Sequence, residues 1–529
     1  MSQPAAAAPQ EREQWSYSHQ EIMVILAGLM AGMLLAALDQ SIVGTALPRI
    51  VSELGGLDQL SWVVTAYLLT STAATPLWGK ISDLYGRRRI FQAAIIIFLI
   101  GSVLAGLSQN MAELIIFRAI QGIGGGGLMA IAFATIGDIV PPRERGKYQG
   151  YLAAVFGISS VAGPLLGGWF TEGPGWRWIF FINIPVGLVA LVITSIALRL
   201  PTPRREHSID YLGAALIVGS VTSLLLYLDW AGRERGWTDP ASLVLLALAV
   251  VFGILFVVVE QRSPEPIIPM RLFRNDIFAV GNLYGFLAGM AMFGGIIFLP
   301  LYLQAVKGMS PTQSGLALLP MVAGIFTTAI GTGALISKTG RYKIYPILGA
   351  AIIAVALFLM SRLSPVTPYW LVAVYMYLFG FGLGTTMQTI TVAVQNSVEF
   401  RDMGTATSST TFFRQMGGTV GAAIFGAILS SRLAVHMQAA FPNMDMPAGG
   451  MQSAMNDMQA LQNIPEPIRS KVLEGFAGAL GDVFLAGIPI AILAVVVAFF
   501  LREIPLRSGA PTGEAALEVA EFEASSVGI

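Results

Sequence analysis

Three ionisable side chains lie inside long apolar segments of the sequence, where they are able to take part in proton transfer. Asp39 is the only acidic residue well inside the first apolar segment, and Arg118 and Arg414 are the only basic residues inside any such segment. Charged groups in an apolar medium are costly and usually have a function. Burial favours the neutral form of a carboxyl group and a nearby guanidinium favours the charged form, so Asp39 is a candidate for proton coupling.

The residue positions leave open which arginine is the partner of this carboxylate. Arg118 lies at a depth similar to that of Asp39, and Arg414 lies nearer the middle of its segment, so either guanidinium could reach it. In the proton-coupling interpretation, Asp39 exchanges an arginine partner for a proton during the working cycle. A static ion pair that holds helices together is the alternative for all three residues.

Other kinds of chemistry lack the residues they need. The chain has no cysteine, and its histidines at His19, His207 and His436 lie outside the apolar segments. We therefore expect no enzyme activity, no cofactor and no metal site. The glycine-rich run Gly122–Gly127 follows no strand and lacks the Lys-Ser/Thr of a phosphate-binding loop. An ion gradient is the expected energy source rather than a nucleotide.

The composition of the 529-residue chain is that of a membrane protein. Hydrophobic residues make up 55% and charged residues 12%, and the net charge is zero. The apolar residues form runs of about 20, the length that crosses the hydrocarbon core of a bilayer. This composition excludes a soluble enzyme, a disordered tail and a fibrous protein, and the zero net charge gives no reason to expect nucleic acid as a partner. We expect fourteen membrane-spanning helices, at 22–47, 60–79, 90–108, 111–137, 148–170, 179–199, 211–230, 242–260, 276–304, 312–336, 345–361, 367–394, 404–430 and 479–501.

The basic residues between these helices predict the orientation of the chain in the membrane. With the N-terminus in the cytoplasm, 20 of the 31 Lys and Arg residues lie in cytoplasmic segments and nine lie in outer segments. This excess follows the positive-inside rule. We therefore expect a multi-pass protein of a prokaryotic inner membrane, with both termini in the cytoplasm.

Two pairs of similar segments indicate an internal duplication. GKISDLYGRRR (Gly79–Arg89) is similar to GALISKTGRYK (Gly333–Lys343), which follows 254 residues later. RERGK (Arg143–Lys147) is similar to RDMGT (Arg401–Thr405), 258 residues later. Repeated bundles around a central cavity are the architecture of secondary transporters. The predicted parts are a disordered N-terminus (1–20), a six-helix bundle (21–199), two inserted helices (200–275), a second six-helix bundle (276–501) with a long outer loop (431–478), and a tail (502–529).

Six segments resemble, in register, the fourteen-helix drug:proton antiporter family of the major facilitator superfamily. They are LDQSIVGTALP (Leu38–Pro48), GKISDLYGRRR (Gly79–Arg89), RAIQGIG (Arg118–Gly124), GISSVAGPLLGG (Gly157–Gly168), WRWIFFINIPVG (Trp176–Gly187) and PLYLQAVKGMSPTQSG (Pro300–Gly315). This resemblance implies an all-α membrane protein with the major facilitator fold, in which two six-helix bundles flank a central site and two helices are inserted between them. It also implies proton-driven export of drugs by alternating access.

The resemblance assigns functions to two of these segments. The first is a gating element, whose residues are Gly79, Asp83, Gly86, Arg87 and Arg88. The second is the antiporter motif, whose residues are Gly157, Gly163, Pro164, Gly167 and Gly168. A basic loop that only fixes the orientation is the alternative for the first, and a generic helix-packing face is the alternative for the second.

Aromatic and amide side chains inside the apolar segments are candidates for a substrate cavity, because they suit large amphipathic ligands. They are Trp62, Tyr67, Asn282, Tyr284, Phe293, Gln304, Gln388, Gln395, Phe412 and Phe413. Helix packing or anchoring at the lipid interface is the alternative for each. No second acidic residue lies deep in the predicted cavity, so we expect neutral, lipophilic or lipid-like cargo rather than divalent cations.

The leading hypothesis is a monomeric, proton-coupled antiporter that exports hydrophobic or amphipathic compounds, with protons, small substrates and membrane lipids as its partners. An alternative keeps the fold and exports a lipid, a siderophore or an endogenous metabolite. A membrane-embedded enzyme lacks a catalytic cluster, and a non-transporting scaffold would leave three buried charges without a role.

Overall fold

The structure is a computed structural model that describes residues 17–55, 59–198, 210–233, 236–441, 466 and 468–506. These residues form helices joined by short turns, without a strand among them. Twelve of the described helices are long and apolar enough to cross a membrane, and the shorter helix Ile344–Met360 is apolar as well. The all-helical membrane fold is confirmed, whereas the count of fourteen membrane-spanning helices is not.

The helices follow one another closely along the chain. Those of the first part are α1 (His19–Leu54), α2 (Leu60–Tyr85), α3 (Arg87–Leu107), α4 (Met111–Ile139), α5 (Pro142–Glu172), α6 (Trp178–Phe181), α7 (Asn183–Ala197), α8 (Tyr211–Arg233) and α9 (Pro240–Glu260). Those of the second part are η2 (Met270–Arg274), α10 (Asp276–Leu301), η3 (Tyr302–Val306), α11 (Pro311–Ala317), α12 (Leu319–Thr339), α13 (Ile344–Met360), α14 (Tyr369–Ser397), η4 (Phe400–Asp402), α15 (Met403–Ala440) and α18 (Ile468–Phe499).

Side chains and glycines set where several of these helices begin and end. Ser18 and Glu21 form a capping box at the start of α1, and Asn110 accepts a hydrogen bond from a backbone N–H in the first turn of α4. Such caps satisfy N–H groups that have no partner within the helix. Gly86 has a φ of 91°, so the chain turns between α2 and α3 within a single residue.

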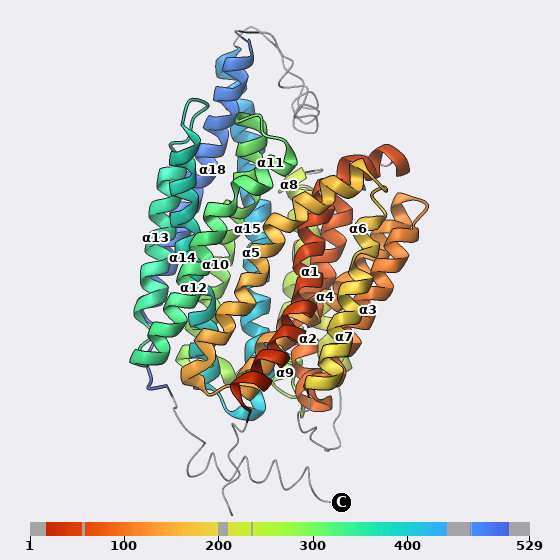
Figure 1. Cartoon of the computed structure of the whole chain (residues 1–529), viewed down its shortest axis with the longest axis vertical. Coiled ribbons are helices and arrows are strands. Elements are labelled where there is room, and N and C mark those ends of the chain that lie inside the picture. Colours follow the sequence, from red (N-terminus) through yellow and green to blue (C-terminus); the bar gives the residue numbers. More distant parts are fainter. Residues whose placement is uncertain are drawn as a thin grey trace, which may run out of the picture.

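Two groups of helices lie side by side along their lengths (Figure 1). Helices α1 to α7 enclose one apolar core, which includes Met33, Phe91 and Phe98. Helices α10 to α18 enclose another, which includes Phe298 and Phe379. We call these groups the N-half and the C-half. Helices α8 and α9 pack on each other, and α8 also contacts α2 of the N-half and α15 of the C-half.

Several expected segments fall at the limits of the described chain. The predicted disordered N-terminus lies outside the described residues except for 17–20, and α1 already begins at His19. In the expected outer loop 431–478, α15 continues to Ala440 and α18 begins at Ile468, while most of the residues between them lie outside the described part. The tail is described only as far as Leu506.

Candidate functional site

A buried ion pair between Asp39 of α1 and Arg118 of α4 lies inside the N-half. The side chains are 0% and 1% exposed, respectively. Arg118 donates to Oδ2 of Asp39, and the Nε2 atom of Gln121 donates to Oδ1 of the same carboxylate at 2.8 Å. Arg118 also donates to the side-chain oxygen of Gln121 at 2.7 Å and to the carbonyl oxygen of Val63 at 3.2 Å. The carboxylate therefore receives donors on both oxygens, as a buried charge requires.

A second layer of groups completes the surroundings of this pair. The Nδ2 atom of Asn183 lies 3.5 Å from Oδ1 of Asp39 and donates to the Ser102 hydroxyl at 2.9 Å. The ring of Tyr67 lies with its centroid 4.3 Å from the guanidinium carbon of Arg118, which is a cation–π contact. Gln121 and Asn183 were not among the site residues predicted from the sequence. Their signal was an amide side chain inside an apolar helix, in two segments that carry the family resemblance.

The glycines of α4 explain how Arg118 comes so close to its neighbours. A Cβ atom on Gly122 would lie 2.4 Å from the carbonyl oxygen of Tyr67, and one on Gly126 would lie 2.2 Å from that of Ser71. Both contacts are to α2, so α4 packs on α2 backbone to backbone. The glycine-rich run is therefore a helix-packing face, which agrees with the rejection of a phosphate-binding loop.

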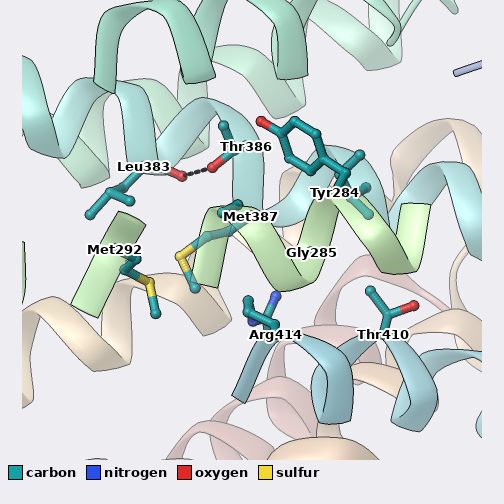
Figure 2. Close-up of a pocket in the computed structure, with 10 residues that line it drawn as sticks. Tyr284, Gly285, Met292, Leu383, Thr386, Met387, Thr410 and Arg414 are labelled. Carbon is teal, nitrogen blue, oxygen red and sulfur yellow. Dashed lines mark hydrogen bonds between the residues drawn. The ribbon is translucent and has the colours of Figure 1, made fainter. Parts of the chain in front are cut away.

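Arg414 of α15 is separate from this pair. It forms no hydrogen bond or ion pair with any residue that the structure describes. Its guanidinium carbon lies 5.9 Å from the ring centroid of Phe133 in α4, across the boundary between the two halves. The structure thus pairs Asp39 with Arg118 and places Arg414 against a small cavity in the C-half instead (Figure 2).

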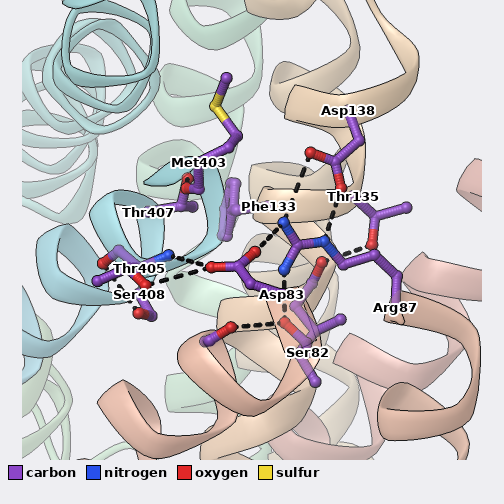
Figure 3. A network of polar contacts seen from close by, with 12 residues as sticks. Ser82, Asp83, Arg87, Phe133, Thr135, Asp138, Met403, Thr405, Thr407 and Ser408 are labelled. Carbon is purple, nitrogen blue, oxygen red and sulfur yellow. Dashed lines mark hydrogen bonds and ion pairs between the residues drawn. The ribbon is translucent and has the colours of Figure 1, made fainter. Parts of the chain in front are cut away.

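Asp83 and Arg87 of the predicted gating element belong to a polar network that joins the two halves (Figure 3). Arg87 pairs with Asp83 at 2.5 Å and with Asp138 at 2.6 Å. The second carboxylate oxygen of Asp83 accepts a hydrogen bond from the backbone N–H of Thr405, at the start of α15, at 2.9 Å. Of the remaining residues expected here, Gly86 forms the turn after α2, and Arg88 is half-buried and forms no ion pair with another described residue.

Gly79 permits this contact between the halves. A Cβ atom at this position would lie 2.0 Å from the hydroxyl oxygen of Ser408 in α15. Burial of the carboxyl group raises the pKa of Asp83 to about 6, although the Arg87 guanidinium opposes this rise. Asp83 lies beyond the predicted span 60–79, at the end of the bundle where α1 begins.

Further hydrogen bonds join the halves at this same end, which we call the lower end. Arg143 of α5 donates to the carbonyl oxygens of Ser337 and Lys338 in α12, at 2.7 and 3.0 Å. Gln395 of α14 accepts a hydrogen bond from Gln149 at 3.0 Å and donates to the carbonyl oxygen of Phe133 at 3.1 Å. The lower end is therefore closed in this structure.

The residues of the predicted antiporter motif place α5 between α1 and the C-half. Cβ atoms on Gly163 and Gly167 would lie 2.1 and 1.9 Å from side-chain oxygens of α1. A Cβ atom on Gly157 would lie 2.7 Å from Val322 of α12, and one on Gly168 would lie 3.0 Å from Thr312 of α11. Pro164 lies beside Gly315 of α11. Both faces of α5 thus depend on small residues.

The predicted cavity residues are distributed over several environments rather than one. Tyr67 contacts Arg118, Tyr284 lines the cavity beside Arg414, and Gln395 belongs to the closed lower end. Phe412 and Phe413 line a different, apolar cavity of about 380 Å³ between α15 and the helices α8 and α9.

The other predicted cavity residues have local roles in the described chain. Asn282 donates to the carbonyl oxygen of Phe278 at 2.9 Å, and Gln304 lies 3.5 Å from the hydroxyl of Ser314. The side-chain nitrogen of the buried Gln388 has no hydrogen-bond partner among the described residues. Phe293 packs against Gly418, and Trp62 is half-buried in α2.

Comparisons with known proteins agree with this architecture. The family described as "Major Facilitator Superfamily" matches residues 29–422. "Multidrug resistance protein 3" of Bacillus subtilis is 36% identical over 90% of this chain and 94% of its own length. "Multidrug transporter protein MdtP" of the same organism is 40% identical over 77% of this chain and 75% of its own length. An uncharacterized MFS-type transporter of Mycobacterium tuberculosis is 41% identical over 91% of this chain and 70% of its own.

A solved structure shows the same fold at low sequence identity. The human organic anion transporter MFSD10 is superimposed with a TM-score of 0.59 over 92% of this chain and 100% of its own, at 15% identity. This likeness concerns the fold alone.

Proposed function

This chain belongs to the major facilitator superfamily, and from that premise we propose that it is a proton-coupled antiporter that exports hydrophobic or amphipathic compounds. The relatives named above as multidrug transporters support the export of such compounds. The observation that supports proton coupling is the buried Asp39–Arg118 pair, because both side chains are ionisable and neither is exposed to water in this conformation. The relatives are transporters rather than enzymes.

The contacts of the pair provide a way to exchange a proton. Oδ2 of Asp39 is the oxygen that Arg118 occupies, while Oδ1 is held by Gln121. A proton that binds Oδ2 neutralises the carboxyl group and takes the place of the guanidinium. Arg118 then keeps the carbonyl oxygen of Val63, the side-chain oxygen of Gln121 and the ring of Tyr67 as partners. Loss of the carboxylate therefore does not leave this cation without contacts.

Closure of the lower end supplies the second part of the cycle. We place the lower end in the cytoplasm, because the predicted cytoplasmic segments hold 20 of the 31 basic residues. Protonation of Asp39 from the outer side weakens its attraction to Arg118 and allows α1 and α4 to move relative to each other. The Asp83 and Gln395 contacts between the halves then break, and the site opens to the cytoplasm.

Proteoliposomes with a trapped pH indicator test this proposal. A panel of lipophilic dyes is added under an imposed pH gradient, and dye-driven proton movement is compared between the wild type and Asp39→Asn. We expect the variant to exchange dye for dye but to move no protons with it. Glu53→Gln is the control, because Glu53 is an acid of α1 whose side chain is 35% exposed. Undiminished proton movement in Asp39→Asn would refute the assignment.

A second candidate keeps the same fold and exports a lipid, a siderophore or an endogenous metabolite. The side chains that line the cavity beside Arg414 include a cation and no acid, which is unsuited to cationic drugs. Proton movement driven by a lipid or a metabolite, but by none of the dyes, would favour this candidate.

A further inference from the structure

Arg414 is a cation at the boundary between the two halves that has no counter-ion among the described residues. Its guanidinium contacts the ring of Phe133 and lines a cavity between α10, α14 and α15 (Figure 2). The cavity holds about 20 Å³, which is room for a single water molecule. No carboxylate is among its lining residues, and the described chain offers Arg414 no ion pair.

The other polar groups of the cavity already have their hydrogen bonds. The hydroxyl of Tyr284 donates to the carbonyl oxygen of Pro346 at 2.9 Å. The hydroxyl of Thr386 donates to the carbonyl oxygen of Leu383, also at 2.9 Å. The hydroxyl of Thr410 donates to the carbonyl oxygen of Ala406 at 3.0 Å. The guanidinium is therefore the cavity's source of free N–H donors, and it carries a positive charge. Its natural ligand is an anion that accepts hydrogen bonds.

The remaining lining residues indicate what such an anion is attached to. Met292, Leu383, Met387 and Ile390 are apolar, and the two methionines have flexible side chains that adapt to different ligand shapes. A fully hydrated inorganic ion gains nothing from these neighbours, whereas an acid with a hydrocarbon or aromatic body does.

We propose that Arg414 binds the acidic group of an amphipathic organic monoanion, so that the transported compounds include hydrophobic acids. This assignment rests on the proposed export function and defines its substrate class. In the present conformation, in which the lower end is closed, the cavity is too small for such a compound. Movement of Phe133 and α4 away from α15 opens the site, because Phe133 belongs to the other half and its ring centroid lies 5.9 Å from the guanidinium carbon.

A matched pair of fluorescent probes tests the charge requirement in the purified full-length protein. 8-Anilinonaphthalene-1-sulfonate carries a sulfonate, and N-phenyl-1-naphthylamine has the same aromatic body without it. We expect Arg414→Gln to weaken binding of the sulfonate about 10- to 100-fold, the range for loss of a hydrogen-bonded ionic contact. Binding of the neutral probe should change less than about twofold, and Arg414→Lys should restore part of the sulfonate affinity.

A second variant keeps the test decisive if Arg414→Gln does not fold. Thr410 precedes Arg414 by one helical turn, so Thr410→Asp places a carboxylate beside the guanidinium. This internal anion should displace the sulfonate and spare the neutral probe. Arg432→Gln is the control, because Arg432 lies in another part of α15, beside Asp482, and should leave both affinities unchanged.

The outcomes separate this proposal from the export function. Equal weakening of both probes by Arg414→Gln, or unchanged sulfonate binding in Arg414→Gln or Thr410→Asp, overturns the anion site. Nanodiscs with and without phosphatidylglycerol distinguish a lipid headgroup from a dissolved acid as the occupant. If this lipid competes with the sulfonate probe in the wild type but not in Arg414→Gln, the result supports the site and identifies a lipid headgroup as its ligand. Binding is measured without transport, so a failure of proton coupling in vesicles leaves this result intact.

Discussion

Removal of the charge on Asp83 should open the lower end. The carboxylate accepts the backbone N–H of Thr405 at 2.9 Å across the boundary of the halves, and it pairs with Arg87 at 2.5 Å within the N-half. In Asp83→Asn the amide oxygen still accepts the N–H, so the contact changes from a charge-assisted hydrogen bond to a neutral one. That difference is about 0.5–2 kcal/mol, since bonds to charged groups contribute about 1.5–3 kcal/mol and neutral ones about 1 kcal/mol.

The Arg87 pairing adds little to this figure. Arg87 keeps Asp138 at 2.6 Å, so loss of Asp83 does not leave it as an unpaired buried charge. A change of about 0.5–2 kcal/mol raises the ratio of open to closed lower ends roughly 2- to 30-fold.

Spin-label distances measure this ratio directly, because the chain contains no cysteine that would need removal. One label pair replaces the exposed Arg89 and Arg341 at the lower end, and another replaces Glu172 and Val366 at the opposite end. Double electron–electron resonance should show a longer-distance population at the lower pair in Asp83→Asn, with the opposite pair moving closer.

The control for this experiment is a charge change in the same segment. Lys80 pairs with Glu265 at 2.6 Å on the partly exposed surface, and such pairs contribute about 0–1 kcal/mol. Lys80→Gln should therefore leave both distance distributions near those of the wild type. Identical distributions in Asp83→Asn and the wild type would show that the Thr405 contact does not hold the lower end closed.

Gly79, Gln121 and Arg271 give three further predictions. Gly79→Val should prevent closure of the lower end, because its Cβ would overlap Ser408, and the same spin-label pair would report a permanently open state. Gln121→Leu should cost about 1–3 kcal/mol of stability, measured as a lower thermal midpoint, because a buried carboxylate oxygen loses its 2.8 Å donor and keeps only the 3.5 Å contact with Asn183. Arg271 of η2 pairs with Asp402 of η4 at 2.8 Å. Burial raises the pKa of Asp402 and Arg271 opposes this, so Arg271→Gln should lower the thermal midpoint at pH 8 but hardly at pH 5.

Proton linkage explains why Arg271→Gln should lower the thermal midpoint more at high pH than at low pH. Without Arg271, the pKa of Asp402 in the folded protein rises further. The folded protein then keeps a proton on this carboxyl group at pH values where the unfolded chain releases it. Folding is unaffected below the ordinary pKa of the carboxyl group, is penalised increasingly as the pH rises from there to the folded-state pKa, and carries the full penalty above it. Equal destabilisation at both pH values would mean that Arg271 acts through packing rather than through charge.

Residue type and depth were enough to select Asp39 and Arg118, because charged groups are rare in apolar helices and must find each other. They were not enough to exclude Arg414 as the partner, since all three lie on different helices whose rotations are set by packing. Gln121 was not predicted as a site residue, because its amide is uncharged and needs no ionic partner inside an apolar helix. Its position one turn after Arg118, on the same helix face, was a signal that could have identified it.

The expected cavity list was less informative for a physical reason. Aromatic and amide side chains serve equally well in packing, in capping and in ligand contact, and only the tertiary arrangement distinguishes these uses. Gln395 holds the halves together, whereas Asn282 bonds to its own helix. The glycines of α5 were predicted as close-packing positions, and the short distances to Ser41 and Thr45 agree with that use. Their part in antiport stays a prediction.

The anion site proposed at Arg414 would also change how the membrane voltage drives export. Exchange of one outgoing monoanion for one incoming proton carries two elementary charges across the membrane, which at 100 mV is about 4.6 kcal/mol. That voltage alone sustains a roughly 2,000-fold concentration ratio. A neutral cargo would gain roughly 40-fold from the same voltage, and a monovalent cation would gain nothing. Collapse of the voltage with valinomycin and potassium should therefore slow the export of acids most.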